Sequence, residues 1–348
     1  MKWKRFLAIV LAGALLFSMG ACKKNETDDS SSAPSEPEEV VDPNYPVSIG
    51  DIHVDARPET IVSLSPAMTE LICALGAGDR LEGVSDYCDY PSSVDDLERC
   101  GTAATPDLTA IEEIGPDVVF ASSNLSQDDT VKLQQMDAQV IVLGRADSLD
   151  ELEEVYVTVA TVLDGLVDGE ENGQAFFDGL RARYDALKYA ADGIADRLHG
   201  IYLRMVPLTM ATGDTFEGKL LNDALGVNND AGQYTGWLYP EDQAVNLYPD
   251  IIFHDQSIDQ TYFGETKVYS TTAAYQNKRL YAFDALAFER QSPRMFDELE
   301  EMFAQAYPDV KVQEAKSRPD DEVPEDADSE ADDDDEMLDL DDATQIIE

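Results

Sequence analysis

Basic residues are scarce in this sequence. Lys and Arg number 24 against 72 Asp and Glu in 348 residues, which gives a formal net charge of -48. A nucleic-acid partner is excluded on this balance, because neutralising phosphates requires a basic surface. The segment Asp320–Glu348 holds 16 acidic residues and no basic one. About -32 therefore remains on the rest of the chain, which favours neutral or cationic partners.

Histidine and the common catalytic motifs are scarce as well. The three histidines, His53, His199 and His254, have no short metal-ligand spacing. Neither G-x-S-x-G nor H-E-x-x-H occurs. Gly213–Lys219 nearly matches a phosphate-binding loop, but Leu220 stands where Ser or Thr would hold magnesium. These absences predict a protein that catalyses nothing and has no metal site of its own.

The apolar run near the N-terminus, Phe6–Phe17, is shorter than the about 20 residues that span a membrane. Basic residues in Lys2–Arg5 precede it and the small-residue stretch Ser18–Cys22 follows it, an order typical of a cleaved signal peptide. Because that stretch ends in cysteine, it resembles a bacterial lipobox. We expect cleavage before Cys22 and lipidation of its thiol. An ordinary signal peptide with a nearby cysteine is the alternative.

Composition and periodicity divide the chain into segments. The Ser-, Pro- and Glu-rich stretch after Cys22 has no hydrophobic period and is expected to be disordered. Short apolar runs then alternate with amphipathic stretches, as in α/β folds with a largely parallel sheet. The predicted segments are a signal peptide 1–21, a tether 22–44, an N-terminal α/β lobe 45–147, a helical connector 148–197, a C-terminal α/β lobe 198–319 and an acidic disordered tail 320–348.

Apolar spacing and capping residues predict the elements of both lobes. Ser148 and Glu151 form a capping box that opens the first connector helix. A second connector helix is expected over Glu170–Arg197, with a length of about 40 Å. The expected strands are Ile61–Ser65, Leu81–Ser85, Val118–Ala121, Val140–Leu143, Ile201–Val206, Ile251–His254 and Leu280–Phe283. The other expected helices are Met68–Leu75, Leu108–Ile114, Thr130–Met136, Lys219–Leu225 and Pro293–Tyr307.

A weak internal repeat favours two related lobes. Glu70–Gly76 resembles Lys219–Gly226. Ile114–Phe120 likewise resembles Leu247–Phe253, and both of these segments have a Pro-Asp pair directly before an expected buried strand. Two unrelated α/β turns are the alternative.

The cysteines leave one pairing open. Cys73 lies in an apolar helical pattern and is expected to be a small buried residue. Cys88 and Cys100 lie twelve residues apart in loop-like sequence. In an exported protein they could form a disulfide or remain free thiols.

Three stretches resemble class III substrate-binding proteins of ABC importers. Pro58–Gly76 is similar to the first strand–helix unit of that family, Val84–Pro91 to its second strand and following loop, and Phe288–Arg294 to the start of its last helix. The likeness runs over about residues 46–307, and the cobalamin-binding branch is the most similar. It implies an α/β fold of two Rossmann-like lobes joined by a single long helix, with the ligand in the cleft between the lobes.

The resemblance also implies ligand-binding positions. Tyr87 and Trp237 match cleft aromatics of the cobalamin binders, and Arg290 matches a position near the cleft. Ala67 follows the first strand, where the backbone of the family approaches its ligand. At three further aromatic positions of the cobalamin binders this chain has small residues, namely Ala103, Ser122 and Ala287.

The function that the resemblance implies is capture and delivery without catalysis. Cobalamin or another corrinoid is the first expectation for the ligand. Because a corrin prefers aromatic walls, a ferric siderophore or haem stays as the alternative. We expect no cofactor, although the ligand itself would contain cobalt or iron. A surface lipoprotein enzyme on the same scaffold is a more distant alternative.

The expected partners are an ABC permease and ATPase complex, a small-molecule metal chelate and, through the lipid anchor, the cell membrane. The family docks through one acidic residue on each lobe. Asp242 beside Glu241 stands at that place in the second lobe, whereas the first lobe has Thr109 there and Glu112 a turn away. We therefore expect Glu112, Glu241 and Asp242 to dock on the permease, and the protein to be an extracytoplasmic, lipid-anchored monomer.

Overall fold

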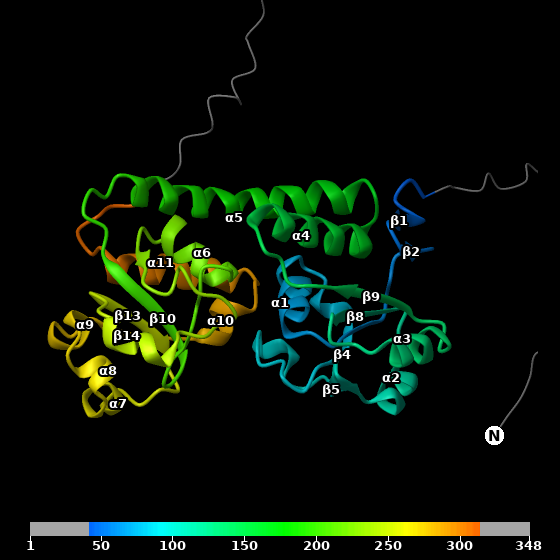
Figure 1. Cartoon of the computed structure of the whole chain (residues 1–348). Helices are drawn as coiled ribbons and strands as arrows, with labels where there is room; N and C mark the ends of the chain where they lie inside the picture. Colours follow the sequence, from blue (N-terminus) through cyan, green and yellow to red (C-terminus); the bar gives the residue numbers. More distant parts are fainter. Residues whose placement is uncertain (1–41, 314–348) are drawn as a thin grey trace, which may run out of the picture. The chain divides into compact units, whose positions relative to one another are not determined.

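Two five-stranded sheets organise residues 42–313, the part of the chain that the computed structural model describes (Figure 1). The predicted signal peptide, Cys22, nearly all of the predicted tether and the acidic tail lie outside the described residues.

The first sheet is entirely parallel, with the strand order β5-β4-β3-β8-β9. Its central strands β3 and β8 are buried, as expected for a parallel sheet that helices cover. The strands are β3 (Ile61–Ser63), β4 (Leu81–Val84), β5 (Glu98–Arg99), β8 (Val118–Ser122) and β9 (Gln139–Leu143). Its helices are α1 (Pro66–Ala74), α2 (Leu108–Ile114) and α3 (Gln127–Gln134). Short hairpins add β1 (Val47–Ile49) with β2 (Ile52–Val54), and β6 (Gly101–Thr102) with β7 (Thr105–Pro106).

The second sheet has the order β11-β10-β13-β14, and β12 also pairs with β10. Only β11 runs antiparallel to its neighbour. The strands are β10 (His199–Met205), β11 (Thr209–Met210), β12 (Asn228–Asn229), β13 (Ile251–Asp255) and β14 (Leu280–Phe283). The helices are α6 (Phe216–Asp223), the 3-10 helix η3 (Glu241–Asn246), α7 (Thr261–Glu265), α8 (Lys267–Ser270), α9 (Ala273–Gln276), α10 (Ala285–Glu289) and α11 (Arg294–Ala306).

Two helices connect the sheets, α4 (Leu149–Asp164) and α5 (Asp168–Asp192) (Figure 1). Phe177 on α5 packs edge-on against Tyr156 of α4, at 5.1 Å between ring centroids, and against Phe296 of α11, at 6.4 Å. The α4 helix also contacts α1 and β1 of the first half, so the pair of connecting helices packs on both halves. The predicted α/β fold of two lobes is confirmed. No helix among residues 42–313 has the length and apolar content needed to cross a membrane.

The α5 helix is shorter at its C-terminal end than the sequence pattern predicts. It ends at Asp192 and not at Arg197, because Gly193, a poor helix former, occupies the C-cap. The predicted capping box of α4 forms in a modified way. Ser148 accepts a hydrogen bond from the amide of Glu151, while the Glu151 carboxylate accepts from the amide of Asp147.

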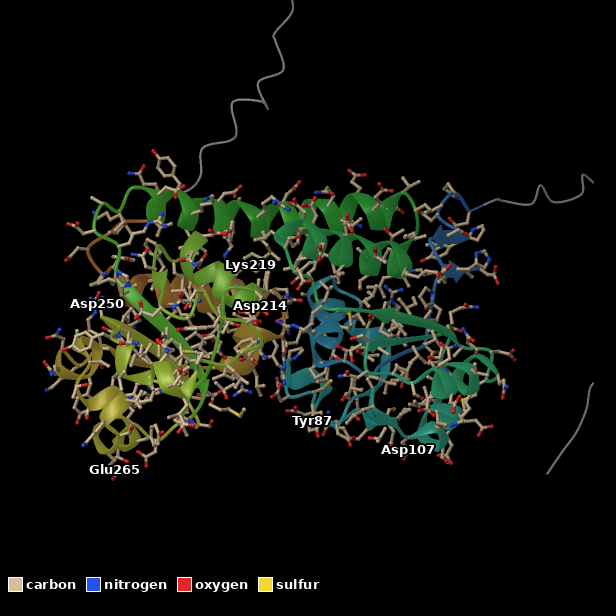
Figure 2. All side chains as sticks on the ribbon, in the orientation of Figure 1. Tyr87, Asp107, Asp214, Lys219, Asp250 and Glu265 are labelled. Atoms are coloured by element: carbon tan, nitrogen blue, oxygen red, sulfur yellow. The ribbon has the colours of Figure 1, made fainter. Side chains whose placement is uncertain are left out.

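The internal repeat has a structural counterpart in its two Pro-Asp pairs. Asp117 accepts a hydrogen bond from the amide of Thr60 at 2.9 Å and donates its own amide to the Thr60 carbonyl at 2.9 Å. Asp250, labelled in Figure 2, makes the same two bonds with His199, at 3.0 and 2.8 Å. In each sheet an aspartate at the start of one central strand thus fixes the start of its parallel neighbour, which favours related lobes over unrelated turns.

Cys73, Cys88 and Cys100 are free thiols, so the possible disulfide between Cys88 and Cys100 is not formed. The Cys88 sulfur lies 3.2 Å from the hydroxyl of Thr69. Burial raises the pKa of Cys73 and of Cys100 to about 11, so both thiols stay protonated at neutral pH.

Candidate functional site

A cavity of about 400 Å³ lies between the two lobes. On the first lobe its walls lie at the carboxyl ends of three parallel strands: residues 65–68, which follow β3 and begin α1, residues 122–124 at the end of β8, and residues 143–145 at the end of β9. On the second lobe the wall is α10 and the turn after it. Ligands of open α/β sheets bind outside the carboxyl ends of the strands, and this volume suits a small-molecule site.

The walls of this cavity are mixed in character. Apolar side chains line much of it, namely Ala67, Met68, Leu143, Leu152, Val155 and Leu286. The charged residues on the walls are Arg145, Glu289 and Arg290. Such a cavity can bury an apolar body and orient it through a few polar contacts.

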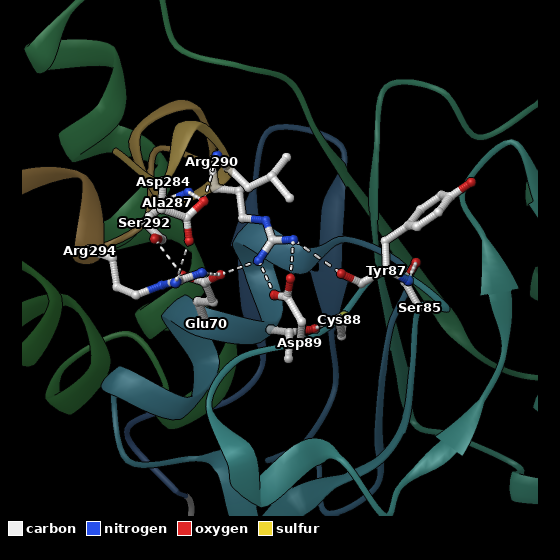
Figure 3. A network of polar contacts seen from close by, with 12 residues as sticks. Glu70, Ser85, Tyr87, Cys88, Asp89, Asp284, Ala287, Arg290, Ser292 and Arg294 are labelled. Carbon is white, nitrogen blue, oxygen red and sulfur yellow. Dashed lines mark hydrogen bonds and ion pairs between the residues drawn. The ribbon is translucent and has the colours of Figure 1, made fainter. Parts of the chain in front are cut away.

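A buried carboxylate, Glu70 on α1, joins the two lobes beside the cavity (Figure 3). It accepts hydrogen bonds from Arg290 at 2.8 Å, from Arg294 at 2.6 Å and from Ser292 at 2.6 Å. Its side chain is only 1% exposed. Arg290 also pairs with Asp89, and hydrogen bonding from its guanidinium lowers the pKa of that carboxyl. An isolated buried charge would be strongly destabilising, so Glu70 depends on these cations from the other lobe.

The turn between α10 and α11 is held from the first lobe as well. The Gln291 side chain donates to the carbonyl of Ala146 at 2.7 Å and accepts from its amide at 2.9 Å. The Tyr156 hydroxyl donates to the Gln291 carbonyl at 3.1 Å. Gln291 has φ +56°, a strained conformation that persists only where surrounding contacts hold it. These contacts fix the second-lobe wall of the cavity against the first lobe.

A second charge network meets α10 at Glu289. Arg145 reaches from the first lobe to the carboxylate of Glu217 and to the carbonyl of Glu289. Within the second lobe, Arg204 pairs with Glu289 at 2.8 Å, and the hydroxyl of Tyr202 donates to the same carboxylate. Burial raises the pKa of Glu217 and, more strongly, that of Tyr202. The Tyr202 hydroxyl therefore stays a hydrogen-bond donor.

The structure brings two of the four predicted ligand-binding residues to the cavity. Ala67 and Arg290 line it. Tyr87 follows β4 and is 69% exposed; its carbonyl accepts from Arg290 at 3.2 Å, but its ring points away from the arginine (Figures 2 and 3). Trp237 is half-buried, with its ring edge-on to Tyr202 at 5.9 Å. Neither aromatic belongs to the residues that line the cavity.

The predicted docking acids lie apart from this cavity. Glu112 is exposed on α2, and Glu241 and Asp242 are exposed at the start of η3. None of the three lines the cavity. Among residues 42–313, no group of three or more His, Cys, Asp or Glu side chains is arranged to hold a metal ion.

Sequence reasoning missed Glu70, Arg145, Glu217 and Glu289. A usable signal existed for Glu70, since it is a lone carboxylate inside the apolar stretch that forms α1. An ionised residue in such a place requires a partner. Nothing local to Arg145 or Glu217 indicates that they meet, because they belong to different lobes.

The sequence matches the periplasmic binding protein family over residues 61–287. This range includes both five-stranded sheets and the helices α1 to α9, so the chain belongs to the periplasmic binding protein family.

Two relatives and one solved structure refine this assignment. The uncharacterized ABC transporter substrate-binding lipoprotein YvrC of Bacillus subtilis is 28% identical over 316 residues, covering 87% of this chain and 96% of that protein. A vitamin B12-binding protein of Vibrio cholerae is 26% identical over 250 residues, covering 70% and 87%. The periplasmic heme-binding protein HutB of Vibrio cholerae superposes with a TM-score of 0.64 at 21% identity, covering 72% of this chain and 99% of HutB. The structural likeness concerns the fold, and the resemblance to class III substrate-binding proteins is confirmed.

Proposed function

We propose that this protein is the extracytoplasmic substrate-binding component of an ABC importer, and that it captures a metal chelate between its lobes. The cavity at the carboxyl ends of the parallel strands, closed by α10 of the other lobe, is the observation that carries the proposal. A corrinoid is the first choice of ligand, because relatives that cover most of this chain are named vitamin B12-binding proteins.

Capture in this proposal relies on a site that is largely formed before the ligand arrives. The bonds of Glu70 and Gln291 already fix one lobe to the other, so little conformational entropy is lost on binding. The α4 helix packs on the first lobe and α5 packs on α4 and on the second lobe, so this helix pair would limit hinge opening. Ala67 and Arg290 would contact the ligand directly. Tyr87 and Trp237 would contact those parts of a large ligand that extend beyond the cavity.

One structural feature favours the alternative that the protein is an enzyme on the same scaffold. Ser48, His53 and Asp55 form a hydrogen-bonded row, with 2.9 Å between Ser48 and His53 and 3.0 Å between His53 and Asp55. All three are exposed on the β1–β2 hairpin, where Ser48 and His53 are a directly opposed cross-strand pair. Hydrolysis by such a row requires positioned oxyanion donors in a site that excludes water. Binding without turnover remains the better account of the cavity.

Native mass spectrometry tests the proposal. The purified protein is exposed separately to cyanocobalamin, haemin and a ferric siderophore, and esterase and peptidase substrates are assayed in parallel. We expect a saturable one-to-one complex with a chelate, cyanocobalamin first, and no turnover. Failure to bind any chelate, or turnover that Ser48→Ala abolishes, would contradict the proposal.

The proposed anchor is the lipidated Cys22, which would keep the protein at the outer face of the cell membrane near a permease and ATPase. The lipoprotein name of the Bacillus subtilis relative supports this placement. Cys22→Ser is expected to move the protein from the membrane fraction to the soluble fraction, as detected by immunoblotting after fractionation. Retention of the variant in the membrane fraction would refute the anchor.

A further inference from the structure

We infer that the cavity selects neutral or cationic metal chelates and rejects polyanionic ones, because the arginines around it are already neutralised by carboxylates of the protein. The inference rests on the proposed function and adds the charge class of the ligand. It depends on three groups of ion pairs, which form around Glu70, Glu217 and Glu289.

Arg290 is one of the two basic residues that line the cavity, and its charge is fully engaged. It pairs with Glu70 at 2.8 Å and also with Asp89, and its own side chain is only 10% exposed. Arg294 behind it is held by Glu70 at 2.6 Å and lies 3.7 Å from Asp284. An anionic group of a ligand would have to take Arg290 from Glu70, which would leave a buried carboxylate with less positive charge.

Arg145 is the other basic residue on the cavity wall. Its side chain is 55% exposed, but its guanidinium pairs with Glu217, whose side chain is only 2% exposed. Glu217 has no other hydrogen-bonded cation among the described residues. An anionic ligand that drew Arg145 away would leave Glu217 as a second buried carboxylate without a partner, which is strongly destabilising. An anionic ligand that shared Arg145 with Glu217 would place two negative charges on one cation, so one of them would stay uncompensated.

The third group adds negative charge to the wall. Glu289 lines the cavity, and Arg204, which pairs with it, pairs also with Asp255 at 3.0 Å. In total, the four arginines of these networks pair with six carboxylates. Lys219 does not line the cavity, and its ammonium donates to the carbonyl of Asp147. Among residues 42–313, no cation that lines the cavity is free to balance a polyanion.

A neutral ligand meets no such obstacle. A guanidinium has five N–H donors, so Arg145 can donate to an amide carbonyl of a ligand while it keeps its bond to Glu217. The Glu289 carboxylate can accept from an amide N–H or a cationic group. Such contacts add hydrogen bonds without separating an existing ion pair.

The experiment compares probes of different charge on the full protein at neutral pH. The probes are cyanocobalamin (neutral), haemin (two carboxylates) and a ferric tris-catecholate (net triple negative charge), with affinities from isothermal titration. We expect cyanocobalamin to bind at least about tenfold more tightly than either anionic probe. Glu217→Gln frees the charge of Arg145 and is expected to raise the affinity ratio of haemin to cyanocobalamin about tenfold. The control Glu113→Gln changes an exposed acid on α2 and should leave that ratio unchanged.

The outcomes separate this inference from the proposed function. Tighter binding of haemin or the tris-catecholate by the wild-type protein overturns the charge selection and leaves capture of a metal chelate in place. Binding of no probe overturns both. If circular dichroism shows that Glu217→Gln folds but its affinity ratio does not move, the assignment of selectivity to the Glu217–Arg145 pair is refuted. If the variant does not fold, the ranking of probes by the wild-type protein decides alone.

Discussion

Trp237 adopts a left-handed backbone conformation, with φ +65°. Its amide donates to the Thr212 hydroxyl at 3.1 Å, and its carbonyl accepts from the amide of Met210 at 3.0 Å. Its ring packs edge-on against Tyr202, whose hydroxyl donates to Glu289 on the cavity wall. The indole is therefore connected to the cavity wall through Tyr202 and Glu289 and does not line the cavity itself.

Trp237→Ala is expected to weaken ligand binding by about 1–3 kcal/mol, the effect of losing an aromatic contact with the part of a large ligand that extends beyond the cavity. Trp3 lies in the predicted signal peptide, so Trp237 would be the only tryptophan of the processed protein. Titration with cyanocobalamin should then quench its emission saturably. The matched control is Tyr189→Ala, which removes an exposed aromatic from α5. Normal binding by a folded Trp237→Ala, together with unquenched emission in the wild type, would assign Trp237 to packing alone.

The ligand-binding positions in the sequence were indicated by family resemblance in short motifs. Ala67 and Arg290, which the family resemblance indicates as ligand-binding positions, both line the cavity, and their contact with a ligand stays a prediction. Glu70 was not predicted, since Arg290, its partner, lies 220 residues away. A charge pair between two lobes leaves no periodic trace in either lobe.

At the scale of elements, the start of α5 depends on a distant residue. The helix has no side-chain cap of its own at Val167. Asn44 supplies the cap from outside the helix. Its side-chain carbonyl accepts hydrogen bonds from the backbone amides of Val167 and Asp168, both at 3.0 Å, and its side-chain NH2 group donates to the Asp168 carboxylate. Asn44 therefore belongs to the folded part, although the sequence placed it at the end of the tether.

Asn44→Ala removes this cap and is expected to destabilise the protein by about 1–2 kcal/mol, or roughly 2–6 °C in Tm. Differential scanning calorimetry measures the change. Asn277→Ala is the matched control, because the described residues give its exposed side chain no hydrogen bond. Equal Tm values for the two variants would show that the α5 N-terminus is held by packing and not by Asn44.

The elements of this fold were predicted from sequence more closely than their ends. The seven longer strands of the two sheets lie where apolar runs predicted them, since burial on both faces gives a continuous apolar signal. The first turn of α1 was missed because Pro66, which breaks a helix interior, is favourable in the first turn. The strands β5, β11 and β12 were missed, because each has two residues and carries no period to detect.

At the scale of the whole molecule, the proposed docking surface and the cavity are made of different residues. Glu241 and Asp242 are exposed at the start of η3, and neither lines the cavity. Substitutions at Glu241 and Asp242 should therefore change docking on the permease without changing the affinity for the ligand. In a chain with net charge -48, two acids matter for docking only if their position is specific.

Reversing both charges, with Glu241→Lys and Asp242→Lys together, is expected to reduce uptake several-fold and to leave ligand affinity unchanged. One exposed ion pair contributes under about 1 kcal/mol, so the double change is the informative one. Uptake is measured in cells that contain the cognate permease and ATPase. Asp95→Lys with Asp96→Lys, an equally exposed pair, is the control for total charge. If both double variants transport like wild type, Glu241 and Asp242 have no part in docking.

The bonds of Glu70 have a consequence for how such proteins can recombine. Its carboxylate is buried in one lobe, and the side chains that donate to it all come from residues 290–294 of the other lobe. A chimera that joined the first lobe of this chain to the second lobe of a relative without those arginines would carry an unpaired buried anion. The two lobes, however similar in plan, are not interchangeable modules: a functional hybrid must exchange Glu70 and its arginines as one unit.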